Sequence, residues 1–218
     1  MAVIRGAGEQ HFTAGADVCE MAQAALTCTG EARGPFIREW LAGVQAVFMA
    51  IERSPKVFIC AMKGLAYGGG VEMAAACDIR VAAEDARFAL PEVKIGIMPG
   101  YGGTQRVARL MGKGRALTFI LSAEPMDAMT AQGAGLVDVL TEPGAAEATA
   151  LAIAERLSGY APLAMAGVKQ AIHAGAHLSL DAALQVEAEL FAQVALSADT
   201  VEGVTAFVQK RKPVFLGK

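Results

Sequence analysis

Gly68-Gly69-Gly70-Val71-Glu72, followed along the chain by Ala89-Leu90-Pro91-Glu92, is the stretch that decides the fold of this 218-residue chain. Three consecutive glycines let a ligand approach bare backbone, because no Cβ stands in the way. The residues after them, 71–76, favour a helix. The pattern therefore predicts a tight turn that leads into a helix N-terminus, where unpaired N–H groups and the helix dipole stabilise negative charge on an oxygen.

Two carboxylates belong to the same stretch. Glu72 falls in the first turn of the predicted helix, and Glu92 follows Pro91 in a loop. Each has an ordinary structural explanation, since acidic residues suit helix N-termini and Pro-Glu commonly opens a helix. Together, beside a site that stabilises an oxyanion, they indicate groups that move protons or activate water.

The segments around this stretch predict an α/β protein. Residues 57–62 form a continuous apolar run, typical of a strand covered on both faces. Further strands are predicted at residues 79–82 and 87–89. Before them, apolar residues recur at helical spacing over residues 36–51, after a polar break at 27–35. Val3-Ile4 is expected to end a buried strand, and Asp17 to cap a helix that runs to residue 26.

The second half of the chain is predicted to be mainly helical. One strand is expected at residues 136–139, and a helix is expected near residues 104–110 after the glycines of 100–103. Four helices of alternating polarity are expected beyond them, at residues 145–157, 163–173, 180–196 and 201–211.

Several longer motifs make the chain resemble the crotonase superfamily, and within it most closely the enoyl-CoA hydratases. The resemblance runs over essentially the whole chain. It is carried by Phe12-Thr13-Ala14-Gly15-Ala16-Asp17, Ala66-Tyr67-Gly68-Gly69-Gly70-Val71-Glu72, Cys77-Asp78-Ile79-Arg80, Pro91-Glu92-Val93-Lys94-Ile95-Gly96-Ile97-Met98-Pro99-Gly100, Gly103-Thr104-Gln105-Arg106 and Ala206-Phe207-Val208-Gln209-Lys210-Arg211-Lys212.

The resemblance implies a fold and a reaction. It implies a spiral of β-β-α units over residues 1–143 and a helical oligomerisation region over 144–218, which assembles a trimer or a hexamer made of two trimers. It places an oxyanion hole on the N–H groups of Ala16 and Gly69. Glu72 would activate water for attack on C3 of a trans-2-enoyl-CoA, and Glu92 would deliver a proton to C2, giving a 3-hydroxyacyl-CoA in fatty-acid β-oxidation or related catabolism.

The same resemblance implies contacts with the acyl-CoA substrate from both parts of the chain. The expected contact residues are Ala14, Asp17, Val18, Gly68, Pro91, Gly100, Phe191, Phe207 and Lys210. No metal or other cofactor is expected, since CoA is part of the substrate. Two alternatives stay open: another crotonase enzyme, such as an enoyl-CoA isomerase that shuttles a proton with one glutamate, and a non-catalytic acyl-CoA-binding protein.

The composition of the chain argues against several other classes of function. A net charge of −3 and a pI near 5.7 argue against a nucleic-acid surface or an anionic membrane surface. RNA binding, known in one crotonase relative, would need a basic face that the alternating charges do not predict. Neither a signal peptide nor a membrane-length apolar run is visible. Cys60 and Cys77 lie in apolar runs, as buried structural thiols do, and a reduced, cytoplasmic protein is expected.

Other motifs fail in detail. Gly6-Ala7-Gly8 lacks the third glycine of a dinucleotide fingerprint, and no Gly-x-Ser-x-Gly sequence is present for a serine hydrolase. His173 and His177 have ligand-like spacing but no acidic partner follows them, so two solvent-facing residues are expected. Compared with the crotonase pattern, the chain starts immediately before an interior strand, and we expect the natural protein to begin upstream of Met1. The alternative is a short paralogue that covers the exposed edge of its sheet in another way.

Overall fold

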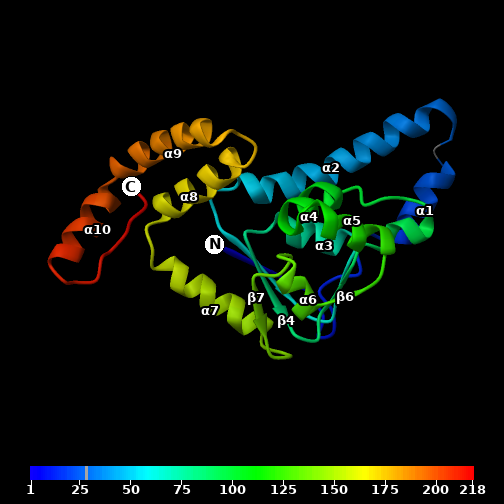
Figure 1. Cartoon of the computed structure of the whole chain (residues 1–218), viewed down its shortest axis with the longest axis horizontal. Coiled ribbons are helices and arrows are strands. Elements are labelled where there is room, and N and C mark those ends of the chain that lie inside the picture. Colours follow the sequence, from blue (N-terminus) through cyan, green and yellow to red (C-terminus); the bar gives the residue numbers. More distant parts are fainter. Residues whose placement is uncertain (28) are drawn as a thin grey trace. The chain divides into compact units, whose positions relative to one another are not determined.

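The computed structural model describes residues 1–27 and 29–218, so Cys28 lies outside the described residues. The chain forms two compact units. The larger unit comprises Val3–Glu52 and Phe58–Ala150, and the smaller unit comprises Met1–Ala2, Arg53–Val57 and Leu151–Lys218. The elements of each unit can be followed in Figure 1.

A four-stranded sheet forms one layer of the larger unit. Its strand order is β1 (Ala2–Arg5), β2 (Phe58–Met62), β4 (Ile79–Ala83) and β7 (Val139–Thr141). The pairs β2–β4 and β4–β7 are both parallel. All but the first residue of β2 and of β4 are buried, which agrees with the apolar runs that predicted these two strands.

A second, three-stranded sheet positions the glycine turn. It contains β3 (Leu65–Tyr67), β5 (Arg87–Ala89) and β6 (Met126–Asp127). Strands β3 and β5 run parallel, with Tyr67 opposite Ala89 at their carboxyl ends. The glycine turn leaves β3 and Pro91-Glu92 leaves β5, so the two halves of the decisive stretch emerge at the same edge of the sheet.

Helices make up most of the remaining structure. The larger unit contains α1 (Val18–Thr27), α2 (Arg33–Arg53), α3 (Gly69–Ala76), α4 (Gly103–Met111), α5 (Lys113–Ser122) and α6 (Ala128–Gly133), with short 3₁₀ helices η1 (Gly30–Ala32) and η2 (Pro91–Ile95). Beyond them, α7 (Ala146–Ser158) leads into the smaller unit, which holds α8 (Pro162–Gly175), α9 (Leu180–Ala195) and α10 (Ala198–Val208).

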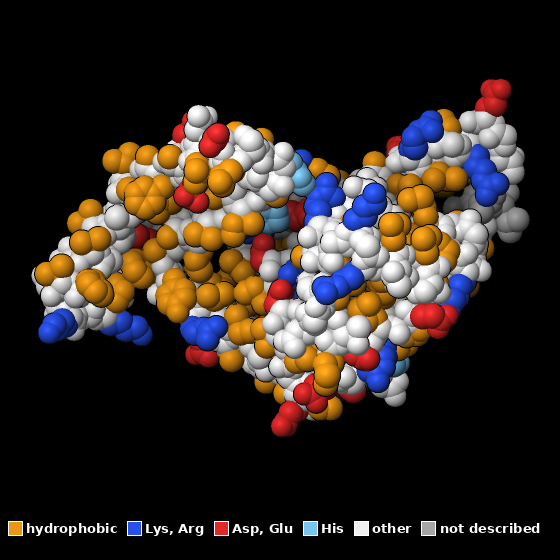
Figure 2. All heavy atoms as spheres, viewed as in Figure 1, with side chains coloured by type: hydrophobic (Ala, Val, Ile, Leu, Met, Phe, Trp, Pro, Cys, Tyr) orange, Lys and Arg blue, Asp and Glu red, His pale blue; other side chains and the backbone are white. Residues whose placement is uncertain are grey.

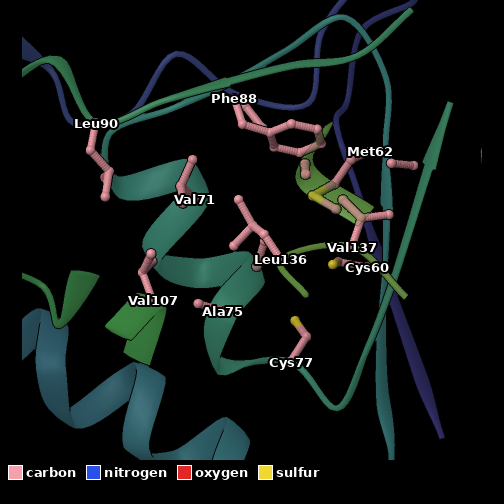
Figure 3. Close-up of a cluster of buried hydrophobic side chains, with 14 of the residues drawn as sticks. Cys60, Met62, Val71, Ala75, Cys77, Phe88, Leu90, Val107, Leu136 and Val137 are labelled. Carbon is pink, nitrogen blue, oxygen red and sulfur yellow. The ribbon is translucent and has the colours of Figure 1, made fainter. Parts of the chain in front are cut away.

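The hydrophobic core of the larger unit surrounds α3. Val71 and Ala75 from this helix lie among Phe88, Leu136 and Met62 (Figure 3). The fully buried side chains are mostly aliphatic, in keeping with the low aromatic content of the chain. Because α3 is embedded in the core, its N-terminus is held rigidly where the glycine turn delivers it.

The Cys77-Asp78-Ile79-Arg80 motif fastens the four-stranded sheet. Asp78 Oδ2 accepts a hydrogen bond from the Phe58 N–H at 2.7 Å, at the start of β2. Arg80 is 6% exposed and donates from Nη2 to both carboxylate oxygens of Asp138, at 3.0 and 2.8 Å. Cys60 and Cys77 are buried free thiols, as expected. This motif therefore has a structural role.

Five details of the predicted element pattern were wrong. Val3 and Ile4 lie in a strand, β1, but they are half-buried rather than buried, because β1 is the edge strand of its sheet. The strand β3 was missed, because three residues after Lys63-Gly64 are too few to show a period. Helix α2 begins at Arg33, inside the predicted break, since the proline at position 35 lies in its first turn, where a missing N–H is harmless. Residues 136–137 are buried but precede β7. Helix α10 spans Ala198–Val208, so the basic run follows the helix.

The smaller unit carries many exposed apolar side chains. Its buried carboxylate, Asp199, accepts from the N–H groups of Leu216 and Gly217 and so fastens the C-terminal segment to α10. On α9, α10 and the turn between them, large apolar side chains are 50 to 88% exposed (Figure 2). They are Leu180, Leu184, Phe191, Leu196, Val201, Val204, Phe207 and Val208.

Within the described ranges, none of the helices combines the length and the apolar character that crossing a membrane requires.

Candidate active site

The glycine turn requires glycine for different reasons at successive positions. Gly68 precedes α3 with φ +52° and ψ −124°, a conformation that a residue with a side chain rarely adopts. Its N–H donates to the Ala89 carbonyl at 2.8 Å, which ties the turn to the end of β5. A Cβ on Gly70 would stand 2.5 Å from Thr13 Cγ2, so this position is closed by packing.

Two backbone N–H groups converge beside Gly69. A Cβ on Gly69 would lie 3.7 Å from the Ala16 nitrogen, and one on Gly15 would lie 3.2 Å from the Gly69 nitrogen. Gly15 has φ +101°, which turns the chain so that Ala16 faces the start of α3. Neither the Ala16 nor the Gly69 N–H donates to any acceptor in the part of the chain that the structure describes. The structure thus brings together both predicted oxyanion donors.

Glu72 is buried and firmly held. Its side chain is 1% exposed, and Oε1 accepts hydrogen bonds from the N–H groups of Tyr101 at 2.8 Å and Gly103 at 2.7 Å. Burial raises the pKa of the Glu72 carboxyl, although these two hydrogen bonds and the positive charge of Arg106 act in the opposite direction. A carboxylate with a raised pKa and a fixed orientation is suited to take a proton from water.

Glu92 faces the glycine turn from η2. A Cβ on Gly68 would lie 3.1 Å from Glu92 Oε1, which places this carboxyl beside the turn. Its Oε2 is buried and has no hydrogen-bond partner among the described residues. Burial raises the pKa of Glu92, and the negative charge of Glu72 raises it further. The structure therefore provides a carboxyl with an unpaired, buried oxygen beside the two N–H donors.

The sequence did not indicate what would hold Glu72 in place. Tyr101 and Gly103 lie in the segment 99–103, a loop that ends at the first residue of α4 and whose glycines predicted only a connection between elements. The Tyr101 ring makes edge-to-face contacts with Trp40 and Phe48, and a Cβ on Gly69 would lie 3.3 Å from its Cδ2. Backbone donors leave no signature in side-chain types, so these partners could be found only in the structure.

The expected substrate contacts are divided between the two units. Ala14, Asp17 and Val18 are exposed at the start of α1, while Gly68, Pro91 and Gly100 lie around the two glutamates. Asp17 Oδ1 accepts from the N–H groups of Cys19 and Glu20, so this carboxylate caps α1. Three further expected contacts lie in the smaller unit, and all are exposed: Phe191, Phe207 and Lys210.

Comparisons with known proteins show which family the chain belongs to. The chain matches the enoyl-CoA hydratase/isomerase family model over residues 1–218. It is 41% identical to the short-chain-enoyl-CoA hydratase of Clostridium acetobutylicum over 210 residues, covering 96% of this chain and 77% of that protein. It is 39% identical to the crotonyl-CoA hydratase of Syntrophomonas wolfei, covering 99% of this chain and 80% of that protein.

Solved structures show the same architecture. A crystal structure of enoyl-CoA hydratase from Bacillus anthracis superimposes with a TM-score of 0.90 at 36% identity, covering 99% of this chain and 81% of that chain. An enoyl-CoA hydratase structure from Geobacillus kaustophilus gives a TM-score of 0.91 at 32% identity. The predicted fold class is confirmed, and the chain belongs to the enoyl-CoA hydratase/isomerase family.

Proposed function

We propose that this protein is an enoyl-CoA hydratase, which adds water reversibly across the 2,3 double bond of a trans-2-enoyl-CoA thioester. The observation that carries the proposal is the meeting of two carboxyls, the buried Glu72 and the half-buried Glu92, beside the N–H groups of Ala16 and Gly69, which have no acceptor among the described residues. The family relationship supports it, since hydratases are among the most similar relatives.

The two N–H groups would bind the thioester oxygen and stabilise the negative charge that develops there when water attacks. Such donors contribute most in a site that excludes water, and losing one oxyanion donor typically costs about 10² to 10³ in rate. Polarisation of the thioester carbonyl makes C3 of the double bond electrophilic. The unhindered backbone at Gly69 allows the thioester to come within hydrogen-bond distance.

The carboxyls would share the proton transfers. Glu72, with Oε1 fixed by two N–H groups, activates the water that attacks C3, and Glu92 delivers a proton to C2 from its unpaired oxygen. This division of roles comes from the family. Because the negative charge of Glu72 contributes to the raised pKa of Glu92, the ionisation of Glu92 depends on the protonation state of Glu72.

The remaining expectations belong to the same proposal. The proposed contacts with the substrate are those that the family relationship implies: Ala14, Asp17, Val18, Gly68, Pro91, Gly100, Phe191, Phe207 and Lys210. Residues 144–218 would form an oligomerisation region that builds a trimer or hexamer. No cofactor beyond the CoA of the substrate is required, and the described free thiols suit a reduced, cytoplasmic setting.

Incubation with crotonyl-CoA tests the proposal. We expect the absorbance of the conjugated thioester to disappear and 3-hydroxybutyryl-CoA to form. Transfer of a double bond in a 3-enoyl-CoA without hydration would instead identify an isomerase. Binding of crotonyl-CoA with no turnover would identify a non-catalytic acyl-CoA-binding protein, and either result would overturn the assignment.

A further inference from the structure

The loop 99–103 is held from outside by three side-chain contacts. Gln45 in α2 donates from Nε2 to the Gly100 carbonyl at 2.7 Å. Arg106 in α4 donates from Nη1 to the Tyr101 carbonyl at 2.9 Å. Leu41 packs against Gly100 so closely that a Cβ there would lie 2.8 Å from Leu41 Cδ2. The loop that supplies both hydrogen bonds to Glu72 is therefore clamped between α2 and α4.

Arg106 is itself fixed by a carboxylate from α2. Its Nε and Nη2 donate to Glu52 Oε1 and Oε2, each at 2.7 Å, in a bidentate arrangement. Both side chains are largely shielded from solvent, with exposed fractions of 13% for Arg106 and 24% for Glu52. A two-point contact holds the guanidinium plane as well as its position, so the third donor is aimed at the Tyr101 carbonyl.

We infer that Glu52 and Arg106 form a positioning pair for the carboxylate of Glu72, with Gln45 as an additional support. Glu52 holds Arg106, Arg106 holds the Tyr101 peptide, and the Tyr101 N–H holds Glu72 Oε1. The inference rests on the proposed function for its catalytic consequence, but not for the structural linkage itself. Neither residue of the pair is assigned to the reacting atoms, so both are positioning residues.

The charge of Arg106 adds a second effect. It opposes the burial that raises the pKa of Glu72. The other titratable groups that face this region are Glu92 from η2, whose pKa Glu72 raises, and Tyr101, whose pKa Glu72 and Glu20 raise in addition to burial. Removal of the Arg106 charge leaves burial less opposed, so the pKa of Glu72 must rise further.

The test compares Arg106→Met, Arg106→Lys, Glu52→Gln and the double variant Glu52→Gln/Arg106→Met, with Arg109→Met as control. Arg109 lies on the same helix, and among the described residues its side chain donates hydrogen bonds only to Gln105, one turn away. Two quantities are measured: the pKa of Glu72, from the ¹³C chemical shift of its carboxyl carbon in free protein, and the pH profiles of kcat and kcat/KM with crotonyl-CoA. The Glu72→Gln variant assigns the NMR signal.

Each variant has a distinct expected outcome. Arg106→Met should raise the pKa of Glu72 and so move the acidic limb of the kcat/KM profile to higher pH. It should also lower kcat by about 10- to 100-fold, because small misplacements of a catalytic group have effects of this size. Arg106→Lys keeps the charge but loses the fork, so kcat should fall while the limb stays near its wild-type position. Glu52→Gln should lower kcat without moving the limb upward, and the double variant should match Arg106→Met alone.

Three results would overturn the inference: a wild-type Glu72 pKa and kcat in Arg106→Met, additive effects in the double variant, or equal effects from Arg109→Met. If Arg106→Met does not fold, Arg106→Lys and Glu52→Gln still decide, because unchanged kcat in both contradicts positioning. If the wild-type protein does not hydrate crotonyl-CoA, the proposed function is wrong, but the positioning pair can still be tested. The NMR titration then reports whether Arg106 affects the pKa of Glu72.

Discussion

The two carboxyls of the site differ in how many partners they have. Glu72 has two backbone donors on one oxygen, whereas Glu92 keeps one buried oxygen without a partner among the described residues. A polar atom buried in this way usually costs stability, and such atoms persist where function needs them. The difference suits a fixed base and an acid whose free oxygen must reach a substrate carbon.

Replacement of either carboxyl by an amide tests their roles. Glu72→Gln and Glu92→Gln should each lower kcat for crotonyl-CoA by about 10² to 10⁴, because an amide cannot transfer the proton. Binding of an unreactive acyl-CoA, measured by calorimetry, should largely survive, since the two N–H donors are unchanged. Near wild-type turnover in either variant would contradict a shared-water mechanism.

The raised pKa of Glu92 also predicts a change in stability. Between the ordinary carboxyl pKa of 4.5 and the raised value, the folded protein binds more protons than the unfolded chain, so the free energy of unfolding falls as pH rises. The substitution Glu92→Gln removes this fall in the free energy of unfolding, because glutamine does not ionise. At about pH 8 we expect the variant to be more stable, near the low end of the roughly 0.5–2 kcal/mol that stabilising substitutions give.

The pH dependence provides the control for this prediction. Urea unfolding at about pH 4, where Glu92 is mostly protonated in both states, should show a smaller difference between variant and wild type. A variant that is less stable than the wild type at both pH values would show that the carboxylate makes a favourable contact in the folded protein.

Gly69 allows a test of the oxyanion donors. In Gly69→Ala the new methyl group would lie 3.7 Å from the Ala16 nitrogen and 3.3 Å from Tyr101 Cδ2, between the donors and the ring. We expect weaker acyl-CoA binding and a kcat/KM lower by at least about tenfold, while far-ultraviolet circular dichroism stays unchanged. Gly114→Ala is the matched control, because its methyl would meet no atom within 4 Å. Full activity of Gly69→Ala would place the thioester elsewhere.

Among the elements, β4 is held by an ion pair between the buried Arg80 and the partly exposed Asp138. Asp138 binds the Arg80 guanidinium and also accepts from the Arg80 N–H at 2.7 Å, so it links β4 to the segment before β7. Asp138→Ala would leave a nearly buried guanidinium without its counter-ion. The free energy of unfolding, measured in urea, should fall by about 3 kcal/mol. This value is at the lower end of the range for buried ion pairs because Asp138 is partly exposed.

The exposed ion pair between Arg5 and Glu147 is the natural comparison. Its side chains are 49 and 44% exposed, and its N···O distance of 3.0 Å is similar to that of the buried pair. Glu147→Ala should change stability by no more than about 1 kcal/mol. Equal losses in the two variants would mean that burial does not govern the contribution of the Arg80–Asp138 pair.

The elements that the sequence could predict are those with a long period or a strong boundary. Helix α2 and strand β2 followed from their apolar patterns, and the glycine turn indicated the start of α3. Strand β3 was not predictable, because three residues show no period and pair only through a partner far along the chain. Residues 136–137 were misread since an apolar run reports burial, not strand geometry.

The candidate site likewise has features that the sequence could indicate and features that only the structure shows. The sequence could single out Glu72, Glu92 and Gly69 as candidates, because a carboxyl group or the absence of a side chain is visible in the residue type. The hydrogen bonds from Tyr101 and Gly103 could not be identified, because every residue except proline has a backbone N–H and only the fold aims it. The hold of Glu52 on Arg106 likewise spans helices far apart in the sequence.

For the whole molecule, the exposed apolar side chains of the smaller unit bear on assembly. Phe207 and Leu196 are more than 80% exposed, and six other large apolar side chains on α9 and α10 are at least half exposed. Exposed apolar side chains gathered on neighbouring helices commonly mark a protein interface. Light scattering at micromolar concentration should give a mass about three or six times the 22.5 kDa of one chain.

Charge on the same helices tests the assembly prediction. Introduction of two carboxylates, in Leu184→Glu/Phe191→Glu, should shift the mass toward that of one chain if α9 lies in the interface. The control Glu187→Gln alters an exposed polar residue of the same helix. A monodisperse monomer for the unmodified protein would contradict the proposed trimer or hexamer.

The register in which β3 pairs with β5 sets the relative positions of the two carboxyls. Tyr67 stands opposite Ala89, and each strand delivers one carboxyl a few residues beyond that pair. A slip of one residue would move Glu92 by about 3.3 Å along the strand and turn alternate side chains to the wrong face. Displacements of only about 1 Å can lower rates 100-fold. Catalytic activity therefore depends on correct pairing of β3 with β5 during folding. A chain that folds with these strands one residue out of register would be compact but inactive.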